Sequence, residues 1–112
     1  MKTTDIASEL GLRVVSAGTD PLKKVTGAYV SDLLSDVIGN AREGQIWITL
    51  QTHVNVVAVA SLKELSAIII VKGLLPGEDT IARAGRENIT ILSTELETFE
   101  IAGRLYELLK RK

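Results

Sequence analysis

The sequence contains no cysteine, two prolines and few aromatic residues. The lack of cysteine excludes a disulfide, a thiolate nucleophile and a thiolate metal site, and it fits a cytoplasmic protein. A single histidine, His53, excludes a two-histidine metal site. Apolar runs such as 67–71 are far shorter than the roughly 20 residues that cross a bilayer, and no apolar signal segment follows Met1. We therefore expect no metal, no membrane contact and no export.

The glycine-containing catalytic motifs are also absent. The chain has no G-x-S-x-G, no G-x-x-x-x-G-K-[ST] and no G-x-G-x-x-G. Hydrolase, P-loop and dinucleotide-binding functions therefore lack the backbone geometry that they need. We expect no cofactor and identify no catalytic residue from motifs.

What is present is typical of a small globular protein. Of its 112 residues, 46% are hydrophobic and 24% are charged, and the net charge is −1. This length and composition predict one domain spanning residues 1–112. The basic residues cluster compactly only at 110–112, where they suit the end of a helix better than a nucleic-acid surface. Nucleic acid is not an expected partner.

Local patterns predict an alternation of helices and strands. Thr4 would cap the first helix, Ser31 would cap the second, and Glu78 and Asp79 would open a later one. In the helix from Glu78, we expect Ile81, Ala82 and Ala84 to face inward. Along the chain we expect a helix at 3–10, a strand at 12–16, a turn at 17–21, a strand at 24–30, a helix from Ser31 to Gly39 or Gly44, a strand at 45–50, a helix at 52–65, a strand at 67–71, a helix from Glu78, a strand at 89–92 and a helix at 95–110.

The segment 52–65 is ambiguous because its valines favour a strand, and a hairpin that turns at 51–53 is the alternative. Connection length favours a helix. The next strand, 67–71, is wholly apolar, which is typical of a parallel strand buried on both faces, and parallel neighbours need a crossover of about a dozen residues. A helix apolar nearly all round needs cover on more than one side. We therefore expect a homodimer that uses this helix or its neighbour.

The repeated β-then-α order from Val25 onward predicts a three-layer α/β/α sandwich around a mainly parallel sheet. Ligands of such sheets bind outside the carboxyl ends of the strands. The polar residues of this chain collect at those ends, which predicts a site for a small anionic or nucleotide-like ligand or for a partner protein. We expect the ligand at the junction 49–55, where a strand end meets a helix start. Gly27, within a strand, indicates a bulge, a close backbone approach or an ordinary edge position. The candidate ligand-binding residues are Gly27, Ser31, Asp32, Thr49, Gln51, Thr52, His53, Asn55, Ser93 and Thr94.

Each of these residues also has a structural interpretation. Helix capping alone would explain Ser31, Thr52 and Ser93, whereas Gln51 and Asn55 are not required for one cap. His53, next to valines, is typical of a hydrogen-bonded structural residue. Two functions therefore stay open. One is a non-catalytic regulatory or ligand-sensing dimer, and the other is a small enzyme that uses Asp32 or His53 as a general base.

Three segments resemble the small stand-alone proteins of the DRTGG-domain family. They are V-T-G-A-Y-V-S-D-L-L (25–34), I-W-I-T-L-Q-T-H-V-N-V-V-A-V-A (46–60) and I-L-S-T…F-E-I-A-G-R-L-Y-E-L-L (91–109), and the resemblance extends over nearly the whole chain from about Val14. It implies a fold like the N-terminal domain of HPr kinase/phosphorylase, a regulatory role and a dimer. Leu50-Gln51-Thr52 stand where the namesake pattern has Asp-Arg, and Val71-Lys72-Gly73 stand where it has Thr-Gly-Gly. The catalytic P-loop portion of the kinase has no counterpart, so the resemblance implies no kinase activity.

Overall fold

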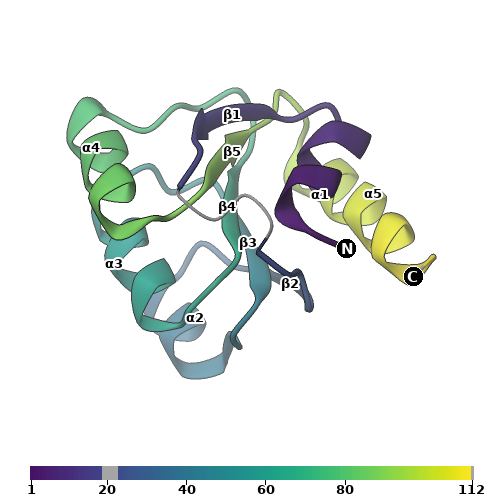
Figure 1. Ribbon diagram of the computed structural model, residues 1–112, viewed down its shortest axis with the longest axis horizontal. Helices are drawn as coiled ribbons and strands as arrows, with labels where there is room; N and C mark the ends of the chain where they lie inside the picture. Colours follow the sequence, from purple (N-terminus) through teal and green to yellow (C-terminus); the bar gives the residue numbers. More distant parts are fainter. Residues whose placement is uncertain (19–22, 112) are drawn as a thin grey trace.

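A five-stranded sheet lies between two layers of helices in the computed structural model, which describes residues 1–18 and 23–111 (Figure 1). Helices α2, α3 and α4 cover one face of the sheet, and α1 and α5 cover the other. Positions 19–21 of the predicted turn lie outside the described residues. In chain order the elements are α1 (Thr3–Glu9), β1 (Arg13–Ser16), β2 (Gly27–Val30), α2 (Leu34–Asn40), β3 (Gln45–Thr49), α3 (Asn55–Leu62), β4 (Ala67–Ile70), α4 (Glu78–Glu87), β5 (Ile91–Ser93) and α5 (Thr98–Lys110).

The strand order is β1-β5-β4-β3-β2, and the four strands from β2 to β5 run parallel to their neighbours. β1 pairs antiparallel with β5 at one edge. This arrangement confirms the predicted α/β/α sandwich around a mainly parallel sheet. Gly27 opens the edge strand β2 and pairs in register with Gln45, so it forms no bulge. The register shift lies instead in β1, between Val14 and Ser16.

The disputed valine-rich segment is a helix, which confirms the crossover and excludes the hairpin. α3 returns the chain so that β4 runs beside β3 in the same direction, with Ile46 opposite Ala67. The helix is shorter than predicted, because the backbone of Glu64 adopts a positive φ of 54° shortly after it. α3 packs between α2 and α4, and four of its eight residues are buried there. Its apolar surface is therefore covered within one chain, and it no longer argues for a second subunit.

Strand β4 separates two cores. Its side chains alternate between the faces, as expected of a strand, but they are buried on both. Ile68 and Ile70 pack with Trp47 and with α2, α3 and α4. Ala67 and Ile69 pack on the opposite side with residues of α1 and α5. The Trp47 indole also donates to the carbonyl of Ser31 at 2.7 Å, so this large side chain is buried with its polar group satisfied.

Four predicted helix caps are wrong. Thr52 and Ser93 precede the true N-caps of α3 and α5, which are Val54 and Glu97. Thr4 lies inside α1, and the free backbone N–H of Lys2 instead donates to the Asp5 carboxylate at 2.9 Å. Ser31 precedes the true N-cap of α2, Leu33, and its hydroxyl accepts from the Leu33 amide at 3.2 Å. A hydroxyl that bonds the backbone two residues onward forms a turn, and in sequence it is indistinguishable from a cap.

The predicted inward faces of two helices also need correction. In α4, Ala82 is exposed, and Thr80 is buried beside Ala84 because its hydroxyl donates to the carbonyl of Thr52. In α5, the predicted face containing Phe99, Ala102, Leu105, Tyr106 and Leu109 is only partly correct. The buried face is formed by Ile101, Leu105 and Leu108. Phe99 is 91% exposed and Tyr106 is 67% exposed.

We expect Ile69→Ala to lower the free energy of unfolding by about 2–5 kcal/mol, because it removes buried methyl groups from a site that cannot collapse between two packed layers. Ile69 is fully buried. Leu62→Ala, at a side chain that is 67% exposed, should change the same quantity by no more than about 0.5 kcal/mol. Urea unfolding followed by Trp47 fluorescence measures both, and equal losses would contradict the double burial of β4.

Candidate functional site

The loops after β2 and β3 are locked together by Asp32. One oxygen of its carboxylate accepts from the Thr49 hydroxyl at 2.9 Å and from the Leu50 amide at 2.8 Å. In the opposite direction, the Gln51 side-chain amide donates to the backbone carbonyl of Asp32 at 3.0 Å. Thr49 is buried, and its hydroxyl oxygen accepts from the backbone amide of Gln51. The structure therefore brings three of the predicted site residues together, Asp32, Thr49 and Gln51. Their hydrogen bonds are made to one another.

The next three predicted residues lie at the start of α3. The Nδ1 atom of His53 accepts from the backbone amide of Asn55 at 3.1 Å. Thr52 uses its carbonyl to accept from Thr80, which attaches α4 to this junction. His53 and Asn55 are exposed. Their described contacts are those of a helix start.

A second polar network links β2 to α2. The Tyr29 hydroxyl donates to Asp36 at 2.8 Å, and the Asn40 side-chain amide donates to the same carboxylate oxygen at 2.9 Å. Hydrogen bonding from Ser31, with that from Tyr29 and Asn40, lowers the pKa of Asp36. The hydrogen bond to Asp36 raises the pKa of Tyr29, and partial burial adds to the rise.

The connections after β4 and β5 diverge, although the two strands are parallel neighbours. The chain leaves β4 toward α4 on one face of the sheet and leaves β5 toward α5 on the other. Such a divergence opens a crevice outside the carboxyl ends of the strands. The two connections stay in contact, because the amides of Lys72 and Gly73 donate to the carbonyls of Leu96 and Thr94, both at 2.9 Å. This contact fixes the edge of the crevice.

A cavity of about 350 Å³ lies at this divergence. Two arginines line it, Arg13 from β1 and Arg104 from α5. Arg104 also forms an ion pair with Glu100 at 2.8 Å. The Glu95 carboxylate lies so close to Gly73 that a Cβ atom there would stand 2.6 Å from it. The complete lining is Leu10, Gly11, Arg13, Gly73, Leu75, Ser93, Thr94, Glu95, Leu96 and Arg104.

The predicted site residues thus fall into three separate places. Ser93 and Thr94 line the crevice, and the cluster from Ser31 to Asn55 lies at the ends of β2 and β3. Gly27 lines a different, apolar cavity beside α5. Sequence reasoning missed Arg13, Gly73 and Arg104 as a group. Gly73 follows the predicted strand 67–71, so the order of elements could have indicated it. The arginines come from the antiparallel strand β1 and from α5, and the sequence does not show that these elements lie beside the end of β5.

Within the described ranges, no group of three or more histidine, aspartate or glutamate side chains is placed to hold a metal ion. Over the same residues, no helix has both the length and the apolar character that crossing a membrane requires. The candidate site is therefore described by the hydrogen-bonding and charged side chains given above.

The architecture is that of an α/β/α domain with a polar crevice at the carboxyl ends of its parallel strands. Its sequence matches the DRTGG domain over residues 5–108, so the chain belongs to the DRTGG domain family. This confirms the resemblance found in the three sequence segments. Among curated proteins, no sequence matches the chain significantly.

A solved structure shares the fold. It comprises the CBS and DRTGG domains of the regulatory region of Clostridium perfringens pyrophosphatase, complexed with the activator diadenosine tetraphosphate. The similarity has a TM-score of 0.71 at 22% sequence identity and covers 93% of this chain. It covers 45% of the other chain, so this protein spans less than half of that regulatory region. At this identity the comparison establishes the fold.

The Tyr29–Asp36 network predicts a plateau in stability against pH. A carboxylate with a lowered pKa contributes stability above its unfolded pKa, about 3.9, and loses it as the pH falls through the folded value. A phenol with a raised pKa contributes below its unfolded pKa, about 10, and loses it as the pH rises through the folded value. We expect the stability advantage over Asp36→Asn to be constant between these limits and to shrink outside them in urea titrations. An advantage independent of pH down to the acid limit would contradict the network.

Proposed function

We propose that this protein is a non-catalytic regulatory domain that senses a small anionic or nucleotide-like ligand. It acts in the cytoplasm as a homodimer, and its ligand occupies the crevice between the carboxyl ends of β4 and β5. The observation that carries the proposal is the pair of arginines, Arg13 and Arg104, among the residues that line the cavity where the two connections diverge. Membership of the DRTGG domain family supports a regulatory role, as does the regulatory region to which the solved relative belongs.

The two arginines of the crevice favour an anion, and the carboxylate of Glu95, which also lines it, opposes them. A guanidinium presents a planar fork of donors that matches the oxygens of a phosphate or carboxylate, and charge-assisted bonds are about twice as strong as neutral ones. Arg13 and Arg104 are solvent-accessible and line the cavity from two different elements, β1 and α5. Ser93 and Thr94 also line the cavity, but the amide, carbonyl and hydroxyl of Thr94 are already bonded to Ile70, Gly73 and Leu96. The volume is near the lower end of the range of small-molecule pockets, about 300–1,000 Å³.

The junction from Thr49 to Asn55 supports binding less directly, because its polar groups already have partners within the chain. Asp32, Thr49 and Gln51 bond one another. Opening them for a ligand would cost about 0.5–1.5 kcal/mol for each hydrogen bond that the ligand failed to replace. Within this proposal the junction is a second contact that the experiment below tests separately from the crevice.

The enzymatic alternative has less support. A general base needs an acceptor free to take a proton from substrate. Oδ1 of Asp32 accepts from both Thr49 and the Leu50 amide, so only its other oxygen could act as the base. Nδ1 of His53 accepts from the amide of Asn55. Asp32→Asn and His53→Gln would distinguish the alternatives if any turnover of a bound ligand were found, because an enzyme would lose turnover with ligand binding retained.

Ligand binding is testable by thermal shift with pyrophosphate, ATP and diadenosine tetraphosphate. A ligand at about 100 times its dissociation constant should stabilise the fold by about 2.7 kcal/mol. We expect Arg13→Gln and Arg104→Gln each to reduce the stabilisation strongly. Arg42→Gln removes an equal charge from the loop before β3, at the opposite end of the strands, and serves as the matched control.

The variants Gln51→Ala and Asn55→Ala complete this test. Retained binding in these two, with binding lost in the two crevice variants, would place the ligand between β4 and β5. The reverse result would move it to the ends of β2 and β3. No stabilisation of the native protein by any of the three probes would contradict the proposed function.

A further inference from the structure

Helix α5 carries a second apolar stripe that no part of the described chain covers. Its buried stripe faces the sheet through Ile101, Leu105 and Leu108. The other stripe contains Phe99, Gly103 and Tyr106, spaced four and three residues apart so that they share one face. Phe99 is 91% exposed and Tyr106 is 67% exposed. Two aromatic side chains this accessible on one helix face form the kind of patch that marks an interaction surface.

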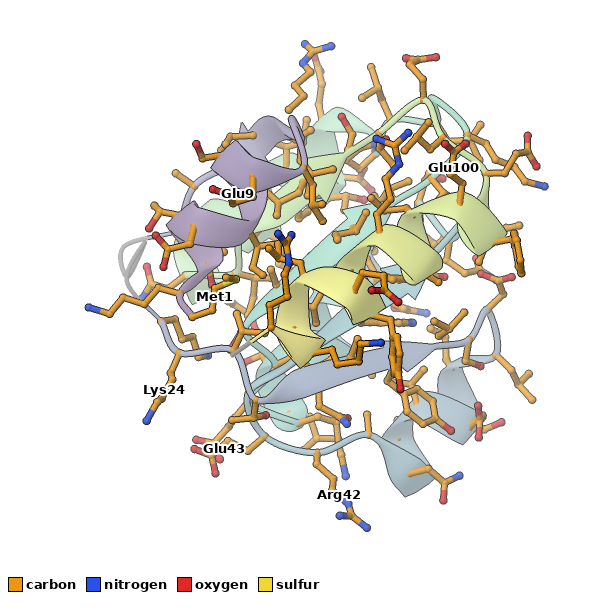
Figure 2. The ribbon with its side chains drawn as sticks, turned by 90° about the vertical axis from the view of Figure 1, so that its right-hand side faces the viewer. Met1, Glu9, Lys24, Arg42, Glu43 and Glu100 are labelled. Atoms are coloured by element: carbon orange, nitrogen blue, oxygen red, sulfur yellow. The ribbon has the colours of Figure 1, made fainter. Side chains whose placement is uncertain are left out.

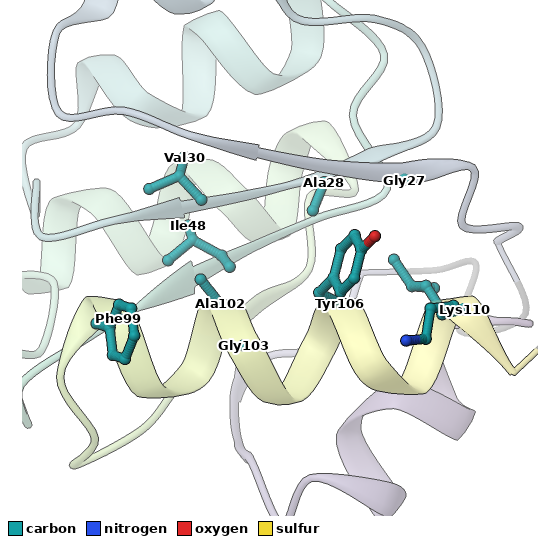
Figure 3. Close-up of a pocket in the computed structure, with 10 residues that line it drawn as sticks. Gly27, Ala28, Val30, Ile48, Phe99, Ala102, Gly103, Tyr106 and Lys110 are labelled. Carbon is teal, nitrogen blue, oxygen red and sulfur yellow. The ribbon is translucent and has the colours of Figure 1, made fainter.

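The stripe borders a groove of about 690 Å³ between α5 and the edge of the sheet. Its floor is apolar and consists of Ala28 and Val30 of β2 with Ile48 of β3. Among the described strands β2 pairs with β3 alone, so within that part of the chain its outer edge is unpaired. Figure 2 shows the face of the sheet that α1 and α5 cover, and β2 runs beside α5 at the edge of that face. In Figure 3, Tyr106 projects from α5 toward Gly27 and Ala28, and Phe99 lies at the other end of the groove.

We propose that α5 of a second copy occupies this groove, antiparallel to the first, about a two-fold axis beside Ala102 and Gly103. This inference rests on the homodimer of the proposed function and names its surface. Phe99 lies three residues before Ala102, and Tyr106 lies three residues after Gly103. An antiparallel pair centred between Ala102 and Gly103 therefore sets Phe99 of each copy opposite Tyr106 of the other. Two small residues at the centre let the helix backbones approach closely.

The charges of α5 fit the same arrangement and select a second copy as the occupant. The segment that leads into the helix and its first turn carry Glu95, Glu97 and Glu100. The second half carries Arg104, Lys110 and Arg111 against a single acid, Glu107. Antiparallel pairing sets the acidic end of each helix beside the basic end of the other. It also opposes the two helix dipoles. An isologous interface requires such a self-complementary surface.

The absence of cysteine allows a direct test by cross-linking. We expect Gly103→Cys to form an intermolecular disulfide under mild oxidation, because residue 103 of the two copies would meet at the axis. Gly85→Cys is the matched control, since Gly85 is also an exposed helical glycine with open space around it, but it lies on α4. Cross-linking of Gly103→Cys alone supports the interface. Equal cross-linking of both variants, or of neither, overturns it.

The oligomeric state provides a second, independent readout. Sedimentation of the native protein over a concentration series should show a dimer. Gly103→Glu places two like charges at the axis and should weaken dimerisation about tenfold or more. The monomer tolerates this side chain because nothing lies within 4 Å of a Cβ atom at Gly103. Gly85→Glu should leave the dimer unchanged.

The outcomes separate the two proposals. A dimer that resists Gly103→Glu overturns this interface and leaves the homodimer standing. A native protein that is monomeric throughout overturns both the homodimer and this interface, and it would assign the groove to a different kind of partner. Ligand binding in the crevice is measured apart from both.

Discussion

The burial of β4 on both faces is the constraint on which the rest of the structure depends. Ala67, Ile68, Ile69 and Ile70 are fully inaccessible, and a strand with this composition cannot have one face in water. Both faces of the sheet must then carry helices. Three crossovers supply α2, α3 and α4 to one face, and the two ends of the chain supply α1 and α5 to the other.

This division of helices also locates the crevice. Because successive strands from β2 to β5 are joined by helices on one face, the strands follow one another across the sheet without reversal. The chain must change face after β5 to cover the other side. The connection after β5 therefore parts from the connection after β4, and the cavity lined by Arg13 and Arg104 lies at that point. The candidate ligand site is thus a consequence of covering β4 twice.

The sequence was sufficient for features that depend on burial and connection length. The uninterrupted apolar strand 67–71 and the distance that separates it from Trp47's strand predicted a crossover helix, and α3 is that helix. It was insufficient where a polar group chooses among partners close in space. Nothing local distinguishes a cap at Ser31 from the turn that it forms with Leu33, and nothing local shows that Asp32 reaches Thr49.

Helix α5 shows why a hydrophobic pattern alone can assign the wrong face. Its apolar residues form two adjacent stripes, and either could have faced the sheet at helical spacing. Packing of Ile101, Leu105 and Leu108 against β-strand residues such as Ile48 and Ile69 decides the matter and leaves Phe99 and Tyr106 outside. The expectation that α3 needs cover from outside its own chain is therefore wrong, because α2 and α4 cover it, whereas Phe99 and Tyr106 of α5 are exposed.

The two proposed interactions meet on α5. Arg104 lines the crevice, and its neighbour Gly103 borders the groove. The ion pair between Arg104 and Glu100 joins successive turns between these surfaces. Arg104 also belongs to the basic half of the helix, so a ligand that draws it away from Glu100 changes the charge of both halves that the proposed pairing sets together. The two proposed interactions thus share one side chain, and by thermodynamic linkage any effect of the ligand on dimerisation is matched by an equal effect of dimerisation on ligand affinity.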